Sequence, residues 1–144
     1  MNKEGPLLVI DNDPSFNRLF SKLCDGEKVV MATTLDAGIR AAAHWHPSYV
    51  FLDVRFDGPW KTGIDVIGQI LTVAPTARIV VMTALANEYD RKRSLEAGAY
   101  AYCRKTDLLS SIGDASGHLS VPSTSRRDHR SLSTARARLM AKKA

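Results

Sequence analysis

The chain has 144 residues, of which 44% are hydrophobic and 24% charged, values that fit one globular domain with a single core. No apolar run approaches the roughly 20 residues that a membrane-spanning helix needs, and the charged first residues do not resemble a signal peptide. The net charge of +5 arises in residues 122–144, with seven basic residues and one acidic residue, since the first 121 residues hold 13 basic and 14 acidic residues.

Five short apolar runs alternate along the chain with segments that have helical periodicity. Three of the runs are rich in Val and Ile or nearly continuous in apolar character, as expected for strands that are covered on both faces. The predicted strands are residues 7–10, 29–32, 49–52, 79–82 and 100–103.

The segments between the strands carry helix signals. Asp13 and Pro14 are typical of a helix start, Pro47 and Pro75 end the second and third helices, and Asn87 begins a fourth that Gly98 ends. In the fourth helix the apolar pattern is weak. The fourth helix has Tyr89 and Leu95 as its main apolar residues. The predicted buried faces of the other helices consist of Phe16, Leu19, Phe20 and Leu23 in the first, Leu35, Gly38, Ile39 and Ala42 in the second, and Ile64, Ile67, Gly68 and Leu71 in the third.

The strict alternation of strands and helices predicts an α/β fold, a doubly wound five-stranded parallel sheet with right-handed crossovers. After Lys105 the pattern weakens, although Leu108, Leu109 and Ile112 could open a fifth helix. We expect one domain over residues 1–119 and a basic, Ser/Arg-rich tail over 120–144 that could form a short helix near its end. Any nucleic-acid contact would rest on this tail alone, and we do not expect nucleic acid or membrane as a partner.

Cys24 falls at the end of a predicted helix and Cys103 in a predicted strand. Two buried free thiols are therefore expected rather than a disulfide, which agrees with a cytoplasmic location.

Polar residues follow four of the predicted strands. Asp11 and Asn12 follow the first strand, Asp53 the third, Thr83 the fourth and Lys105 the fifth. Because the carboxyl ends of parallel strands share one edge of a sheet, these side chains are expected to converge there. Each alone is better explained by helix capping or solvation, but together they suit phosphoryl transfer: carboxylates bind Mg²⁺, one carboxylate acts as nucleophile, and an ammonium and a hydroxyl hold phosphoryl oxygens.

The segments around these residues resemble the response-regulator receiver family of two-component signalling, over about residues 7–112. The resemblance implies a flavodoxin-like sheet in the order 2-1-3-4-5, phosphorylation of Asp53 by a histidine kinase or phosphotransfer protein, and phosphoryl oxygens held by Thr83 and Lys105. It also implies Mg²⁺ bound by Asp11, Asn12, Asp53 and the backbone carbonyl of Arg55, with Tyr102 as the aromatic switch. The matching segments are Leu8-Val9-Ile10-Asp11-Asn12-Asp13-Pro14, Val50-Phe51-Leu52-Asp53, Val80-Val81-Met82-Thr83-Ala84 and Ala97-Gly98-Ala99-Tyr100-Ala101-Tyr102-Cys103-Arg104-Lys105.

The sequence departs from the family pattern around the site. Asn12 replaces an acidic residue, so we expect weaker Mg²⁺ binding, and Thr106 replaces the usual proline, so we expect a trans bond after Lys105. The segment 55–62 is about two residues longer than usual, with Asp57 and Pro59-Trp60 atypical. Arg55 and Leu85 occupy positions that tune signal lifetime, and neither suits an attacking water, so slow self-dephosphorylation is expected.

The leading hypothesis is a stand-alone receiver, not an enzyme, that acts on a downstream protein through its fourth helix and fifth strand, which together with the tail could also form a homodimer. One alternative is a DNA-associated regulator that uses its basic tail, and another is a pseudo-receiver that works without phosphate. A phosphatase of related fold is disfavoured, because it would need a second Asp at the position of Arg55.

Overall fold

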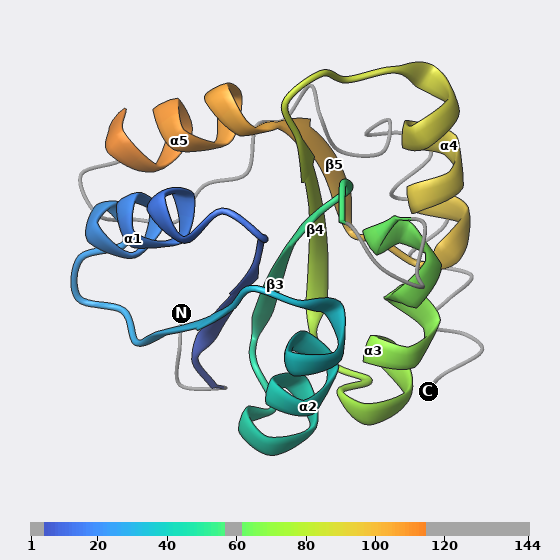
Figure 1. Cartoon of the computed structure of the whole chain (residues 1–144), viewed down its shortest axis with the longest axis horizontal. Helices are drawn as coiled ribbons and strands as arrows, with labels where there is room; N and C mark the ends of the chain where they lie inside the picture. The colour runs from blue at the N-terminus through green and yellow to red at the C-terminus, as the bar shows by residue number, and fades with distance from the viewer. Residues whose placement is uncertain (1–4, 57–61, 115–144) are drawn as a thin grey trace.

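The computed structural model describes residues 5–56 and 62–114 as a parallel sheet between two layers of helices (Figure 1). The helices α1 and α5 cover one face of the sheet, and α2, α3 and α4 lie on the other. The short 3-10 helix η2 leads directly into α3. The elements are β1 (Leu7–Ile10), α1 (Pro14–Leu23), β2 (Val29–Ala32), α2 (Leu35–Trp45), β3 (Tyr49–Asp53), η2 (Gly63–Val66), α3 (Ile67–Val73), β4 (Arg78–Thr83), α4 (Glu88–Ala97), β5 (Ala101–Arg104) and α5 (Lys105–Asp114).

The strand order is β2-β1-β3-β4-β5, which confirms the predicted topology. In register, Ile10 lies beside Ala32 of β2 and Leu52 of β3, so the carboxyl ends of these strands form one edge. All four residues of β1 are fully buried, and they alternate between two apolar cores. Leu8 and Ile10 face the core under α2 and α3, whereas Leu7 and Val9 face the core that contains Phe20 and Phe51.

Helix ends follow the predicted capping chemistry. The Asp13 carboxylate accepts a hydrogen bond from Ser15 N at 2.9 Å, and Asn87 Oδ1 accepts one from Asp90 N at 2.8 Å. Gly98 follows α4 with a φ of 116°, a left-handed conformation that favours glycine. These signals confirm the expected starts of α1 and α4 and the end of α4.

Two predicted buried faces are partly wrong. Leu19 of α1 is 45% exposed, because α1 instead buries Asn17 beside Phe16 and Phe20. Gly68 of α3 is exposed, since the chain enters α3 through a 3-10 turn, which advances about 120° per residue and shifts the phase of the helix. The weak apolar pattern of α4 agrees with its packing, since Tyr89 is 70% exposed and the small residue Ser94 is fully buried.

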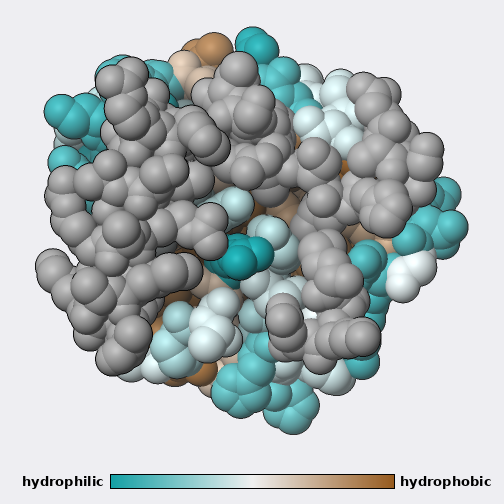
Figure 2. Space-filling model, turned by 180° about the vertical axis from the view of Figure 1, so that it is seen from behind, coloured by the Kyte–Doolittle hydropathy of each residue, from teal (hydrophilic) through white to brown (hydrophobic). Residues whose placement is uncertain are grey.

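The structure also tests the predictions about the two cysteines and the fifth helix. Cys24 and Cys103 are free and buried, as predicted, and burial raises the pKa of each thiol to about 12. The fifth helix forms through Asp114, while the tail lies outside the described residues. Viewed from behind, the described surface is mostly hydrophilic along its rim (Figure 2).

None of the helices within residues 5–56 and 62–114 combines the length and the apolar character that crossing a bilayer would require.

Candidate functional site

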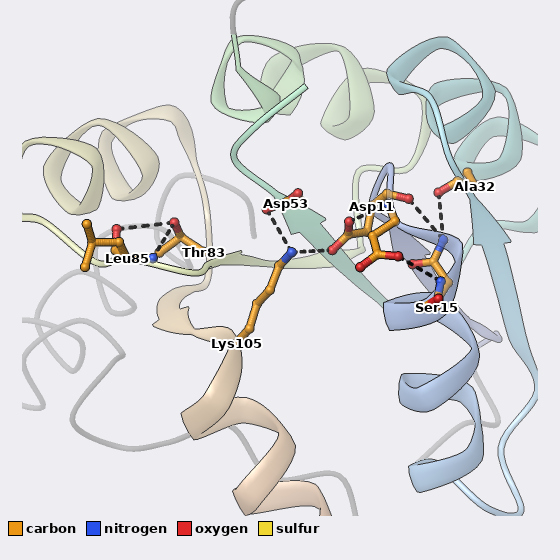
Figure 3. Close-up of polar contacts among 9 residues, drawn as sticks. Asp11, Ser15, Ala32, Asp53, Thr83, Leu85 and Lys105 are labelled. Carbon is orange, nitrogen blue, oxygen red and sulfur yellow. Dashed lines mark hydrogen bonds and ion pairs between the residues drawn. The ribbon is translucent and has the colours of Figure 1, made fainter. Parts of the chain in front are cut away.

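Three charged side chains meet at the carboxyl edge of the sheet. Asp11 follows β1, Asp53 ends β3 and Lys105 begins α5. Lys105 Nζ lies 2.6 Å from Asp11 Oδ2 and 3.4 Å from Asp53 Oδ1, so one ammonium is shared by two carboxylates (Figure 3). The two carboxylates are buried and the Lys105 side chain is 19% exposed, so the group is largely removed from water. The predicted convergence of these three residues is observed.

Asp11 is held in place by its neighbours on α1 and β2. Its Oδ1 accepts a hydrogen bond from Asp13 N at 2.9 Å. Its backbone oxygen accepts one from Asn17 Nδ2 at 3.1 Å, and the same amide reaches the backbone oxygen of Ala32 at 3.4 Å. Asp11 Oδ2 has the Lys105 ammonium as its ion-pair partner at 2.6 Å and no hydrogen bond from another donor among the described residues. That oxygen therefore keeps capacity for a further partner.

Asn17 was missed by the sequence analysis. It is 1% exposed and joins the ends of β1 and β2 through its side chain. Its position next to Phe16, on the side of α1 that faces the sheet, could have indicated a buried polar residue, but an Asn in a helix is far more often exposed.

The electrostatics of Asp53 depend mainly on burial. Burial raises its pKa to about 6, and the Asp11 carboxylate adds to the rise, whereas the Lys105 ammonium and a hydrogen bond with the Val54 backbone oppose it. The opposition is incomplete, because burial is the largest contribution to the pKa and the Asp11 carboxylate adds to it. Asp53 is thus ionised at neutral pH but easily protonated below it.

Thr83 lies at the same edge, at the end of β4, and is 3% exposed. Its hydroxyl is engaged in its own loop: it donates to the Leu85 backbone oxygen at 3.3 Å and accepts from Leu85 N at 3.4 Å (Figure 3). Both bonds are long, so the hydroxyl could exchange them for a stronger acceptor at little cost.

Tyr102 on β5 is buried at 3% exposure. Its hydroxyl accepts a hydrogen bond from the backbone N–H of Asn87 at 3.1 Å, and burial raises its pKa. The ring therefore connects β5 to the residue that caps α4. A role for Tyr102 as a switch aromatic stays a prediction.

Asn12 directly follows Asp11 and Arg55 lies two residues after Asp53 in the sequence, but the structure does not bring their side chains into the ion-pair group. Both side chains are exposed. Within the described part of the chain, no three His, Cys, Asp or Glu side chains form a cluster that could hold a metal. A cation at this edge would therefore rely on the two buried carboxylates and on neutral oxygens such as the Asn12 amide.

The loop after Asp53 is closed at its base. Arg55 pairs with Thr62 in an antiparallel bridge, and Gly63 N donates to the Val54 backbone oxygen at 2.9 Å. Thr62 and Asp65 form a capping box that starts η2, and Asp65 also pairs with Arg93 of α4 at 3.1 Å. The atypical Asp57 and Pro59-Trp60 lie outside the described residues.

The connection from β5 to α5 is direct. Lys105 is itself the first residue of α5, and Arg104 pairs with Asp107 at 2.9 Å across the junction. The described residues contain no cis peptide bond, so the bond to Thr106 is trans as expected. Lys105 thus projects from a helix end rather than from an extended loop.

Replacing Gly63 by alanine is expected to lower the free energy of unfolding by about 1–3 kcal/mol. The new Cβ would overlap the backbone oxygen of Asp53 and lie 3.0 Å from Leu52 Cγ. Urea denaturation measures the change. The matched control is Gly68→Ala, whose Cβ meets no atom within 4 Å, and it should not destabilise the protein. Equal stability of Gly63→Ala and the wild type would contradict this packing.

Comparison with known proteins agrees with this geometry. The family model described as the response regulator receiver domain matches residues 7–112. The chain is 35% identical over 101 residues to the transcriptional regulatory protein KdpE of Mycobacterium tuberculosis, which covers 69% of this chain and 43% of KdpE. The chain thus spans less than half of that relative's length.

Two solved structures share the fold. A receiver domain protein (CheY-like) from Methanospirillum hungatei JF-1 has a TM-score of 0.65 at 22% identity and covers 76% of this chain and 91% of its own. A response regulator protein from Burkholderia pseudomallei, solved with a phosphorylated aspartic acid, a calcium ion and citrate, has a TM-score of 0.64 at 23% identity and covers 74% of this chain and 63% of its own. Given the family match and the five-stranded order β2-β1-β3-β4-β5, the chain belongs to the response regulator receiver domain family, whose members accept a phosphoryl group and are not themselves enzymes.

Proposed function

We propose that Asp53 accepts a phosphoryl group from a histidine kinase or a histidine phosphotransfer protein, and that the phosphorylated domain signals by contacts with a downstream protein. The observation that carries the proposal is the buried Asp53 carboxylate beside the Lys105 ammonium, which Asp11 shares. A nucleophile, a fixed positive charge and a second carboxylate are thus present at one edge of the sheet.

In the proposed step, an Asp53 carboxylate oxygen attacks the phosphorus of the donor. The bond to the donor's leaving atom breaks, and an acyl phosphate forms on Asp53. Lys105 would neutralise one phosphoryl oxygen, and Thr83 would exchange its bonds with Leu85 for a bond to another. With Thr83 drawn toward the phosphoryl group, Tyr102 would transmit the change to α4 through its bond with Asn87.

Receiver domains typically bind a divalent metal, and the residues here fit one. Apart from its ion pair with Lys105, Asp11 Oδ2 accepts no hydrogen bond from the described residues, and Asp53 is a second buried carboxylate. We propose Mg²⁺, held by Asp11, Asp53, the Asn12 amide and the Arg55 carbonyl, which would offset the repulsion between an incoming phosphoryl group and the carboxylates. Asn12 gives this site one negative charge less than an acidic residue would, so binding is expected to be weak.

The test is phosphorylation by acetyl phosphate with Mg²⁺, followed by intact mass. The wild type should gain the mass of one phosphoryl group and Asp53→Asn should gain none. The matched control is Asp36→Asn, because Asp36 is exposed in the first turn of α2, and this variant should gain the same mass as the wild type. Beryllofluoride with Mg²⁺ should shift backbone amide signals near Asp53 and Thr83.

Absence of a response in both assays would overturn phosphorylation and favour a pseudo-receiver. Phosphorylation that persists in Asp53→Asn would assign the acceptor to another residue. With Arg55 two residues after Asp53 and Leu85 two residues after Thr83, we expect the acyl phosphate to hydrolyse slowly, since neither side chain is well suited to orient an attacking water.

A second candidate is a DNA-associated regulator. It is favoured by the regulator KdpE, which is named as transcriptional, and by the charge of residues 122–144. A salt-dependent gel shift that disappears when those residues are deleted would support it.

A homodimer through α4, β5 and the tail is a further proposal, which sedimentation with and without beryllofluoride would test.

A further inference from the structure

The aromatic ring of Phe16 lies against the ammonium of Lys105, with Nζ 4.7 Å from the ring centroid. We propose that Phe16 is a positioning residue that holds the Lys105 ammonium between Asp11 and Asp53. The inference rests on the proposed function of Lys105 as the group that neutralises a phosphoryl oxygen. It adds a residue that no expectation from the sequence assigned to the site.

The contact has the geometry and surroundings of an effective cation–π interaction. The separation falls within the roughly 6 Å over which a cation is attracted to an aromatic face. Phe16 is 9% exposed and the Lys105 side chain 19%, so little water competes for the ammonium. The interaction should therefore be stronger than one at an exposed surface.

The three groups that contact the Lys105 ammonium differ in whether they keep that contact when a cation or a phosphoryl group binds. Asp11 and Asp53 are carboxylates, and both would change partners when a divalent cation or a phosphoryl group arrives. The Phe16 ring neither ligates such a cation nor takes up a proton. It is thus the partner that Lys105 keeps in each state of the site.

Phe16 is itself fixed by packing. Its ring stacks on Phe20 at a centroid distance of 6.2 Å, and Phe20 packs on Phe51 at 4.7 Å. Phe51 belongs to β3, two residues before Asp53. The ring is therefore anchored to the strand that carries the phosphoacceptor. Lys105 has a long, flexible stem, and a rigid wall on one side lowers the entropy lost when its ammonium is held.

The first test is independent of phosphorylation and of metal. Protons above the face of an aromatic ring are shielded, so the Lys105 Hε signals should lie upfield in the wild type, in buffer that contains a chelator. Phe16→Leu should move them to ordinary lysine positions, whereas Phe16→Tyr should keep them upfield. The matched control is Tyr100→Leu, which removes a ring that packs against the same core but precedes β5, at the opposite end of that strand from Lys105, and it should leave these signals upfield.

The second test concerns the reaction. Phe16→Leu should lower the rate constant for phosphorylation by acetyl phosphate about fivefold, and Phe16→Tyr should restore it. In a Lys105→Gln background, Phe16→Leu should have no further effect, because the ring would act only through the ammonium. An equal loss in both backgrounds would show that Phe16 acts through packing alone and would overturn the proposal.

The two tests separate this proposal from the proposed function. Lys105 Hε signals that are the same in the wild type and Phe16→Leu would overturn the positioning role, whatever the rates. A wild type that is not phosphorylated but shows the expected upfield signals would refute the phosphoacceptor while leaving the ring–ammonium contact in place.

Discussion

Lys105→Met is expected to lower the free energy of unfolding by about 3–5 kcal/mol at pH 8. The ammonium is the shared counter-charge of two buried carboxylates, at 2.6 Å from Asp11 and 3.4 Å from Asp53. Methionine fills a similar volume but leaves both carboxylates without that charge. Repulsion between them and the loss of water then act together on the folded state.

The pH dependence identifies this cause. At pH 5 Asp53, whose pKa burial raises to about 6, can take up a proton in the folded state of Lys105→Met, so the loss of stability should be much smaller than at pH 8. Urea denaturation at both pH values measures it. The control is Lys92→Met on the exposed side of α4, which should change stability by less than about 0.5 kcal/mol. A loss that is equal at pH 5 and pH 8 would point to lost packing instead.

Asp53→Asn is expected to stabilise the protein at pH 8 by about 3 kcal/mol, measured in a chelating buffer. Burial and Asp11 raise the pKa of Asp53 from 3.8 to about 6 in the folded state, and a difference of that size corresponds to about 3 kcal/mol. Because the folded state holds the Asp53 proton more tightly than the unfolded chain does, protonation of Asp53 favours folding. This contribution to the free energy of unfolding is fully present below the pKa of the unfolded chain and is lost as pH rises through about 6. Asparagine does not ionise, so the variant avoids the fall in the free energy of unfolding that occurs when the buried Asp53 loses its proton.

The difference between Asp53→Asn and the wild type should therefore be small near pH 4, grow between pH 4 and 6, and level off above that range. Thermal or urea unfolding over this series is the measurement. Asp36→Asn, which removes an exposed carboxylate, should show no comparable trend. A variant less stable than the wild type at pH 8 would mean that the Lys105 ion pair outweighs burial at Asp53.

Much of this molecule follows from local chemistry that the sequence displays directly. The five strands were predicted to within one residue at every end, because strands covered on both faces are nearly continuous apolar runs. Asp13, Asn87 and Gly98 mark helix ends through bonds that span only two to four residues. The convergence of Asp11, Asp53 and Lys105 followed from the parallel topology alone.

Other features depend on how distant segments pack. The side of α1 that faces the sheet buries Asn17 and exposes Leu19, since the amide reaches backbone oxygens at the ends of β1 and β2. The phase of α3 depends on the turn η2 that precedes it. Neither is encoded in the apolar spacing of the helix itself.

The sequence by itself determined the parallel sheet and the charged residues at its edge, because strand burial, capping and parallel topology are local or repetitive rules, whereas the strand order followed from the family resemblance. Only the tertiary structure decided which contacts those residues make. Lys105 lies closer to Asp11 than to Asp53 and against the ring of Phe16, because α1 and α5 pack on the same face of the sheet. Distances between side chains from separate elements arise from that packing, and no spacing along the chain contains them.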